Sequence, residues 1–453
     1  MSSAEPKQAF GTNAATPDDL VPRDLPLDIF ASIEIIPARM NRRSIFRPFA
    51  CCLLAFSLGS QASGDQSAQL HSQRVFKIGV LATLTGSGFT LGQDTVAALQ
   101  IAEEQIEADA ISQHGGYRFK FFVRDTQHDP SKALEAIKDL DRRGVQIIIG
   151  PQTSSEVAMI KPYADVHNIL VISQGSTASS LTIPGDNIFR LCPDDVLEAK
   201  AIVALMLHDG ISNIVPLWRN DAGNNGLHDS VKAQFEALGG TVASGFRYET
   251  TTTDFSAATS SIASQITTLV GGGTDAAKIA VYLAAFDEVV DVFHAAQLMG
   301  VPLSTTRWYG SDGVALSAAL TGDAAAAAFA ASVDYPNPIF GLPDSLQSEW
   351  QPISDEIEAR TEIKPDAFAL STYDALFVIQ RALEDVSDLK NFAAFKAAFV
   401  SEADAYSGIT GSLALNSAGD RANGDFDFWA VRNDTWVRIG TYDGTSGVIT
   451  IFP

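Results

Sequence analysis

Cysteine is scarce in this chain, with three residues in 453. Cys51 and Cys52 are adjacent within an apolar segment, which leaves Cys192 alone in the body of the chain and excludes an intrachain disulfide framework there. The seven histidines are scattered, and the sequence contains neither a CxxC pair nor an HExxH motif. We therefore predict no structural metal and no cofactor.

Positive charge is also scarce, because 31 lysines and arginines stand against 54 aspartates and glutamates, for a formal net charge of -23. Such a chain is repelled by nucleic-acid backbones and by anionic membrane surfaces, so no nucleic acid is expected as a partner. The length of 453 residues and the hydrophobic content of 46% predict two domains, because a single core stops growing at about 250–300 residues.

Motifs of common enzyme sites are missing as well. The sequence has no G-x-S-x-G elbow and no paired metal ligands at catalytic spacing. A glycine-rich loop at 83–92 lacks the lysine of a phosphate-binding loop and does not follow the G-x-G-x-x-G pattern of dinucleotide sites. These absences disfavour nucleotide binding and predict that the protein is not an enzyme.

A secretory signal peptide is indicated at 40–62. Three arginines after Met40 form a basic region, 49–58 form an apolar region, and 60–62 form a small-x-small cleavage site. The apolar run is too short for a stable membrane anchor. A lipoprotein signal is a weaker alternative, since the two adjacent cysteines lie at the start of the apolar run. Residues 1–39 are interpreted as an over-extended, disordered N-terminus, and a periplasmic location is expected.

The stretch 75–106 has the pattern of a strand, a loop and a helix. An apolar run rich in β-branched residues comes first, and apolar residues then recur at helical spacing. The loop at 83–92 contains glycines that allow close backbone approach and hydroxyls, such as that of Thr85, that can bond a small polar ligand. Taken alone, a loop of this composition after a strand is usually only a turn.

The same unit occurs twice more. Apolar strands at 145–149 and 169–172 are each followed by a loop of glycine, serine and threonine. Parallel strands place all such loops at one edge of their sheet, where ligands of open α/β folds bind. Thr85, Ser155 and Thr177 could therefore form a polar cradle for a carboxylate, assisted by the N–H groups of helix N-termini.

A second α/β series begins after Cys192. Strands are expected at 214–218, 242–248, 279–283 and 308–309, with helices at 196–207, 227–238, 255–269 and 289–299. Residues 324–331 are expected as a helix or a strand and 334–338 as a linker. Helices at 346–358, 370–383 and 392–399 and antiparallel strands at 408–415, 426–431, 436–442 and 448–452 complete the chain.

Several short motifs follow one another in a characteristic order between Lys77 and about Trp436. They are Ile78-Gly79-Val80, Leu84-Thr85-Gly86, Gly92, Asp125, Asp129-Pro130, Ala133, Ile148-Ile149-Gly150-Pro151, Ser154-Ser155, Ile172-Ser173, Thr177, Phe189-Arg190, Asp221-Ala222, Gly226-Leu227, Tyr309-Gly310-Ser311-Asp312-Gly313 and Thr372-Tyr373-Asp374-Ala375. In this order the chain resembles the leucine/isoleucine/valine-type solute-binding proteins of ABC transporters, which are type I periplasmic binding proteins.

The resemblance implies an α/β fold with two lobes, each a mainly parallel sheet flanked by helices, joined by three hinge crossovers. It implies that lobe 1 comprises 75–191 and 334–409, and that lobe 2 comprises 192–333 and 410–453. It further implies a small-molecule ligand, which is an amino acid or related solute, and a transporter permease as partner. A monomer is taken as the default state. A ligand sensor for a receptor, or an enzyme on the same scaffold, is the alternative.

In relatives that bind amino acids, residues matching Ser155 and the loop 175–177 hold the ligand carboxylate, and an acidic residue matching Asp312 holds its ammonium. This chain departs from the branched-chain pattern by having no tyrosine at three wall positions. The set of ligand contacts expected from the resemblance is Thr85, Leu91, Gln152, Ser154, Ser155, Gly175, Ser176, Thr177, Gly223, Phe286 and Asp312. Trp218 is an alternative to Phe286 for stacking, and Asp312 could instead belong to a plain turn.

Overall fold

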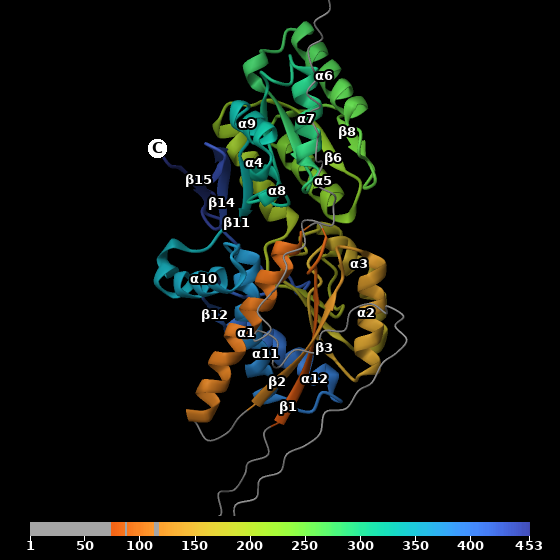
Figure 1. Cartoon of the computed structure of the whole chain (residues 1–453), viewed down its shortest axis with the longest axis vertical. Helices are drawn as coiled ribbons and strands as arrows, with labels where there is room; N and C mark the ends of the chain where they lie inside the picture. Colours follow the sequence, from red (N-terminus) through yellow and green to blue (C-terminus); the bar gives the residue numbers. More distant parts are fainter. Residues whose placement is uncertain (1–73, 87, 113–116) are drawn as a thin grey trace, which may run out of the picture.

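A computed structural model describes residues 74–86, 88–112 and 117–453. The predicted N-terminal segment 1–39 and the signal peptide at 40–62 lie outside the described residues. Two lobes lie one above the other along the long axis in Figure 1. Both have parallel α/β sheets, as the sequence predicts.

The first lobe is built on a five-stranded parallel sheet in the order β2-β1-β3-β4-β5. Its strands are β1 (Arg74–Ala82), β2 (Tyr117–Asp125), β3 (Ile147–Ile149), β4 (Leu170–Ser173) and β5 (Ile188–Arg190). Its helices are α1 (Phe89–Ser112), α2 (Pro130–Arg142), α3 (Ser154–His167), η3 (Ser179–Leu181), α10 (Gln347–Thr361), α11 (Ala367–Asp385) and α12 (Phe392–Ala405).

Both faces of this sheet are covered, which explains the wholly apolar strand β3. Ile147 and Ile149 pack in a core with α1, α10, α11 and α12, whereas Ile148 packs on the other face against α2 and α3. Successive side chains of a strand point to opposite faces, so a strand covered on both faces needs apolar residues at every position.

The second lobe has a parallel sheet in the order β10-β9-β6-β7, in which β8 also pairs with β6. Its strands are β6 (Asn213–Arg219), β7 (Thr241–Val242), β8 (Phe246–Tyr248), β9 (Ile279–Ala284) and β10 (Arg307–Tyr309). Its helices are α4 (Asp195–His208), α5 (Ala222–Ala237), α6 (Ser256–Gly271), η4 (Ala276–Lys278), α7 (Val289–Met299), α8 (Ala318–Gly322) and α9 (Ala324–Ser332). Helices α6, α7 and α9 cover one face of the sheet and α4 and α5 the other.

A third, antiparallel sheet in the order β11-β14-β15-β16 packs beside α4 and α9 (Figure 1). It comprises β11 (Asn337–Phe340), β14 (Phe426–Arg432), β15 (Thr435–Tyr442) and β16 (Ile449–Ile451). The prediction of a linker at 334–338 is therefore wrong in part, since β11 begins within it and pairs with β14. Conversely, Leu413, beyond the expected end of lobe 1 at 409, lies in the core of the first lobe.

Three further elements differ from the sequence-based expectation. Helix α5 begins at Ala222 rather than at the expected residue 227, because Asp221 caps it by accepting a hydrogen bond from the Asn224 N–H at 2.9 Å. The strand expected at 242–248 is divided into β7 and β8. The strand expected at 408–415 is reduced to the short pair β12 (Ser407–Gly408) and β13 (Gly411–Ser412), and η5 (Asp344–Leu346) precedes α10.

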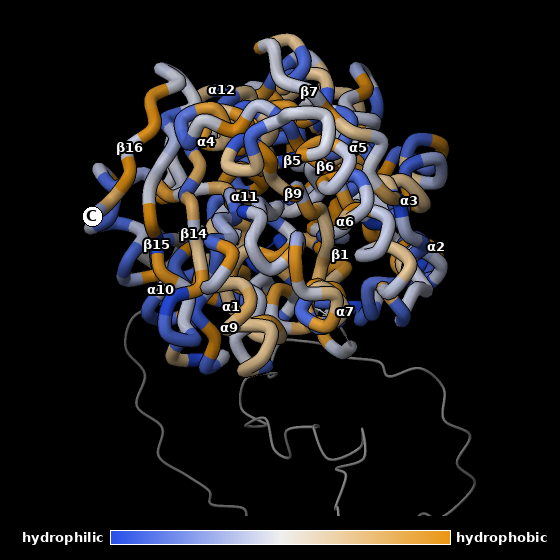
Figure 2. Tube along the Cα trace, turned by 90° about the horizontal axis from the view of Figure 1, so that it is seen from above, coloured by the Kyte–Doolittle hydropathy of each residue, from blue (hydrophilic) through white to orange (hydrophobic). Residues whose placement is uncertain are grey.

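Hydrophilic residues gather at the periphery, for example around α2 and α10 in Figure 2. Among the described helices, none combines the length and the apolar character that a bilayer crossing requires.

A buried ion pair joins the end of β5 to the segment before β14. Arg190 and Asp420 are 0% and 1% exposed, and the guanidinium donates to both carboxylate oxygens, with Nε–Oδ1 at 2.5 Å and Nη2–Oδ2 at 2.7 Å. The same guanidinium donates from Nη1 to the Ala178 carbonyl at 2.6 Å and from Nη2 to the Thr182 hydroxyl at 2.8 Å. Arg190 thus holds the loop after β4 in place.

We expect Asp420→Ala to lower the free energy of unfolding by about 3–5 kcal/mol, because it leaves the Arg190 charge buried without its partner. Urea unfolding monitored by circular dichroism measures this change. The matched control is Glu104→Ala, which removes the ion-pair partner of Arg360. Because the Glu104 side chain is 62% exposed, this substitution should lower the free energy of unfolding by less than about 1 kcal/mol. An equal loss of unfolding free energy in the two variants would contradict a stabilising role of the buried Arg190–Asp420 ion pair.

Candidate functional site

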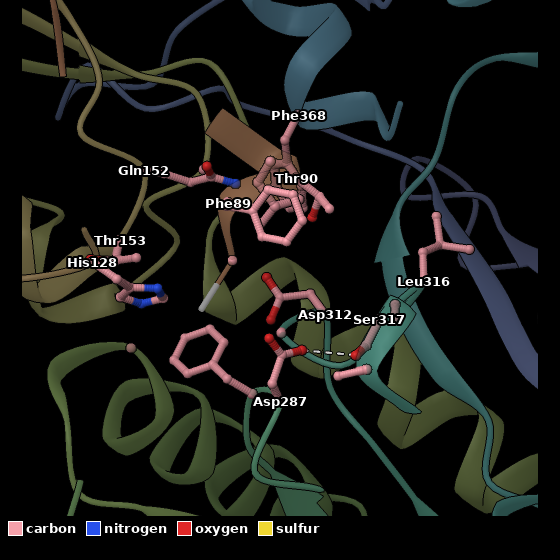
Figure 3. A pocket seen from close by; sticks show the side chains of 18 of the residues that line it. Phe89, Thr90, His128, Gln152, Thr153, Asp287, Asp312, Leu316, Ser317 and Phe368 are labelled. Carbon is pink, nitrogen blue, oxygen red and sulfur yellow. Dashed lines mark hydrogen bonds between the residues drawn. The ribbon is translucent and has the colours of Figure 1, made fainter. Parts of the chain in front are cut away.

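A cleft of about 1260 Å³ lies between the two lobes. Its walls come from loops at the carboxyl ends of β1, β3, β4, β6, β9 and β10 and from the N-termini of α3, α5 and α11. Figure 3 shows the Asp312 carboxylate below Phe89 and Phe368, with Gln152 and His128 at the side of the same space. The cleft is therefore assembled from both lobes, as the convergence of strand-end loops predicts.

Nine of the eleven predicted ligand contacts line this cleft. They are Leu91, Gln152, Ser154, Ser155, Gly175, Thr177, Gly223, Phe286 and Asp312. Thr85 and Ser176 do not line it. Thr85 donates its hydroxyl to the Asp125 carboxylate at 2.5 Å, and Ser176 is fully buried with its hydroxyl bonded to that of Ser154 at 3.1 Å.

The N-terminus of α3 forms one wall. Thr153 caps the helix together with Glu156, whose carboxylate accepts from the Thr153 hydroxyl at 2.6 Å. The Ser154 hydroxyl accepts from the Ala178 N–H at 3.1 Å and so ties the loop after β4 to this helix. The Ser155 side chain is half-buried and lines the cleft next to these fixed groups, which makes its hydroxyl available to a ligand.

Asp312 lies in the opposite wall, after β10, and is backed by a second carboxyl group. Its backbone N–H donates to Glu198 Oε1 at 3.0 Å. Burial raises the pKa of Asp312 to about 6, although hydrogen bonds from the Gly313 N–H and from Glu198 act in the opposite direction. Burial, together with the nearby Asp312 and Asp195 carboxyls, raises the pKa of Glu198 well above its usual value. Asp312 and Glu198 thus form a buried pair of carboxyl groups, of which Asp312 lines the cleft.

Asp195, the first residue of α4, is a cleft residue that the sequence-based prediction missed. It is 1% exposed, and its Oδ2 accepts from the Ser179 N–H at 3.3 Å, while its Oδ1 has no hydrogen-bond partner among the described residues. Burial raises its pKa to about 8. A Cβ at Gly226 would lie 2.6 Å from Oδ2, so only glycine there leaves room for this carboxyl group. Its sequence signal is the doubled aspartate at a helix start, of which Asp194 alone is needed as the cap.

Three phenylalanines, Phe89, Phe286 and Phe368, contribute apolar surface to the cleft, and only Phe286 was predicted. The Phe286 ring has the Arg219 guanidinium 5.5 Å from its centroid on one side and meets His128 edge-on at 5.2 Å. Because His128 belongs to the first lobe and Phe286 to the second, this contact bridges the lobes. Trp218, the alternative stacking residue, packs instead on His228 at 3.8 Å and does not line the cleft.

Acidic groups dominate the cleft, but they are not arranged around a metal. No group of three histidine, cysteine, aspartate or glutamate side chains in the described parts of the chain could hold a metal ion. What the arrangement offers is hydrogen-bonding hydroxyls in one wall and carboxylates in the other, with aromatic surface between them.

A family model described as periplasmic binding protein matches residues 75–435. The chain belongs to this family.

This periplasmic binding protein is 28% identical over 395 residues to an uncharacterized protein of Methanocaldococcus jannaschii, a match that covers 83% of this chain and 92% of that one. It also superposes on a leucine binding protein from Thermotoga maritima with a TM-score of 0.65, at 19% identity, covering 81% of this chain and 99% of that chain. A solute-binding protein of an ABC transporter from R. palustris, solved with benzoate, gives a TM-score of 0.63, at 19% identity, covering 81% and 96%. The fold is thus the two-lobed type I periplasmic binding fold.

The raised pKa of Asp195 predicts a pH-dependent stability for this binding protein. Between pH 3.8 and about 8 the folded chain keeps a proton that the unfolded chain has released, so the contribution of this group to stability falls as the pH rises through that window. We expect Asp195→Asn to raise the Tm of the ligand-free protein by about 2 °C or more at pH 8 and by much less at pH 5. Differential scanning calorimetry at both pH values measures the difference.

The control for this experiment is Asp385→Asn, at the exposed last residue of α11. Its change in Tm should be small and the same at both pH values, because that carboxyl group is solvated in the folded and unfolded chain alike. A change in Tm for Asp195→Asn that is equal at pH 5 and pH 8 would contradict the burial of an uncompensated carboxyl group at this position.

Proposed function

We propose that the protein is the periplasmic solute-binding component of an ABC importer. It binds an amino acid or a similar small polar or zwitterionic solute in the interlobe cleft and delivers it to a membrane permease. The observation that carries this proposal is the placement of Asp312 and Ser155, from opposite lobes, on the walls of one cleft. Membership of the periplasmic binding protein family supports the same role.

The two walls suit the two ends of such a solute. Asp312 accepts hydrogen bonds from an ammonium group, and a hydrogen bond to a charged group contributes about 1.5–3 kcal/mol. The Ser155 and Thr177 hydroxyls receive the other polar end, while Phe89 and Phe286 cover the apolar part. The solute therefore contacts both lobes only when they are closed.

Transport follows from this differential contact. A ligand that touches both lobes binds the closed state more tightly than the open state and so shifts the population toward closure. The chain passes between the lobes in the segments between β5 and α4, between β11 and α10, and between β13 and β14, and we assign the hinge to these three segments. The protein acts as a monomer whose closed form is presented to the permease, and it performs no chemistry on its solute.

A thermal-shift screen of the mature chain against amino acids, amino-acid amides and small aromatic acids tests this proposal. A true ligand at about 100 times its Kd should stabilise the protein by roughly 2.7 kcal/mol. Asp312→Ala and Ser155→Ala should abolish or strongly reduce the shift for the best ligand, because each removes one of the two opposing anchors.

Two substitutions outside the cleft serve as controls. Asp385→Ala, at the exposed end of α11, and Ser264→Ala, on the exposed side of α6, remove the same side-chain types and should keep the full shift. If the Asp312 and Ser155 variants responded as fully as these controls, the solute would not bind at the proposed anchors. If no compound in the screen shifted the wild-type protein, the solute class would be wrong.

A further inference from the structure

The first lobe contributes a buried carboxyl group to the cleft whose hydrogen-bonding capacity is not filled. Asp94, in the second turn of α1, lines the cleft and is 2% exposed, and its Oδ1 has no hydrogen-bond partner among the described residues. Burial raises its pKa to about 8, although the Thr361 hydroxyl acts in the opposite direction. Because a buried oxygen without a donor costs free energy, this position favours a ligand that brings an N–H group to it.

Asp366 of the first lobe lies within electrostatic range of both Asp94 and Asp312, which belong to different lobes. It is the N-cap of α11 and lines the cleft, and its carboxylate adds to the rise in pKa that burial causes in both Asp94 and Asp312. Charge effects of this kind act between neighbouring groups. In Figure 3 the Asp312 carboxylate lies below Phe368, two residues after Asp366. The carboxyl groups of Asp94, Asp366 and Asp312, here called the interlobe acids, therefore face one part of the cleft from both lobes.

The positively charged side chains of the cleft lining are engaged elsewhere. The Arg219 guanidinium pairs with Asp221 at 2.8 Å and with Glu288 at 3.2 Å. Lys364 is exposed, and its Nζ lies 5.6 Å from the centroid of the Trp429 ring. Neither cation is among the groups that shift the pKa of the interlobe acids. The positive charge that would offset the burial of these carboxyl groups is therefore expected from the ligand.

An ammonium group fits this arrangement, because it has three N–H donors and no acceptor. We infer that the ammonium of the solute binds between the lobes, where Asp94 and Asp366 join Asp312 in holding it. The inference rests on the proposed function and deepens it, since it adds two acids of the first lobe to the ligand contacts. An ammonium held by both lobes stabilises the closed state, whereas one held by Asp312 alone does not distinguish the closed state from the open one.

Occupation of this subsite should release protons. At pH 7 the Asp94 carboxyl group of the empty cleft holds a proton, because burial raises its pKa to about 8. A nearby positive charge favours the ionised carboxylate, so ammonium binding lowers that pKa and the proton leaves to solvent. The other titratable groups that act on the interlobe acids, or on which these acids act, are Glu358 of α10, Asp195 and Glu198 of α4, Cys192 and Tyr282. Because Asp195 and Glu198 also have raised pKa values, the contribution of Asp94 to the release is read from a variant.

Isothermal titration calorimetry at pH 7 with two sets of compounds tests the subsite. One set is leucine, isoamylamine and isocaproate, and the other is phenylalanine, phenethylamine and 3-phenylpropionate. The last compound of each set lacks the amine and should bind at least about tenfold more weakly than the amino acid. Asp94→Asn and Asp366→Asn should each weaken the binding of the amines by at least about fivefold. Asparagine is as good an N-cap as aspartate, so Asp366→Asn keeps α11 capped. The control is Asp275→Asn, at an exposed capping aspartate outside the cleft lining, which should leave the affinity unchanged.

The same titrations in two buffers of different ionisation enthalpy measure the protons released on binding. We expect the wild-type protein to release about half a proton or more per amine bound at pH 7. In Asp94→Asn the release should fall to about half of the wild-type value or less, and in Asp275→Asn it should be unchanged. A purely structural role of Asp94 would alter the affinity without altering the number of protons released.

The possible outcomes separate this inference from the proposal on which it rests. Equal or tighter binding of the compounds without an amine would overturn the inference and leave the solute-binding function in place. Unchanged binding of the amines by folded Asp94→Asn and Asp366→Asn variants would mean that Asp312 holds the ammonium without the first lobe, and would also overturn it. Failure of all six compounds to bind would overturn the proposed solute class, and the inference with it.

Discussion

Parallel strand pairing is the constraint on which the rest of this structure depends. Parallel strands that return through helices place every strand-to-helix loop at one edge of the sheet. Both principal sheets of the chain are built in this way, and their loop-bearing edges line one cleft. Residues as distant in sequence as Ser155 and Asp312 therefore face the same space without any direct contact between their strands.

The cleft wall at the N-terminus of α3 is held in position by buried polar contacts rather than by apolar packing. Arg190 fixes the carbonyl of Ala178, and the Ala178 N–H in turn donates to the Ser154 hydroxyl at the start of α3. Because the guanidinium is held by Asp420, which follows β13, the geometry of this wall depends on a segment more than 200 residues away. A network of this kind is rigid when all its members are bonded, which suits a surface that must be preformed for a ligand.

The fold of this protein is shared with its relatives, whereas the acidic lining of its cleft is a property of its own side chains. The type I periplasmic binding fold is shared by a leucine binding protein and by a solute-binding protein solved with benzoate. The walls decide between such solutes. In this chain a glycine at position 226 leaves room for the Asp195 carboxyl group, whose neighbours include Thr177, Asp312 and Arg190.

The sequence by itself determined the α/β pattern, the two lobes and the strand-end loops, because apolar periodicity and the position of loops after strands are local properties. That was enough to bring Ser155 and Thr177 to one edge of a sheet, whereas Asp312 was expected at the site from the family resemblance. Only the tertiary structure shows that Thr85 is not available to the cleft. Parallel pairing sets Ala82 opposite Asp125, so the Asp125 carboxylate lies beside the loop after β1 and accepts a hydrogen bond from the Thr85 hydroxyl. Likewise, only the packing of α4 against α5 turns Asp195 from an ordinary first-turn acid into a buried group of the cleft. Register and helix packing are long-range properties that single-sequence patterns do not carry.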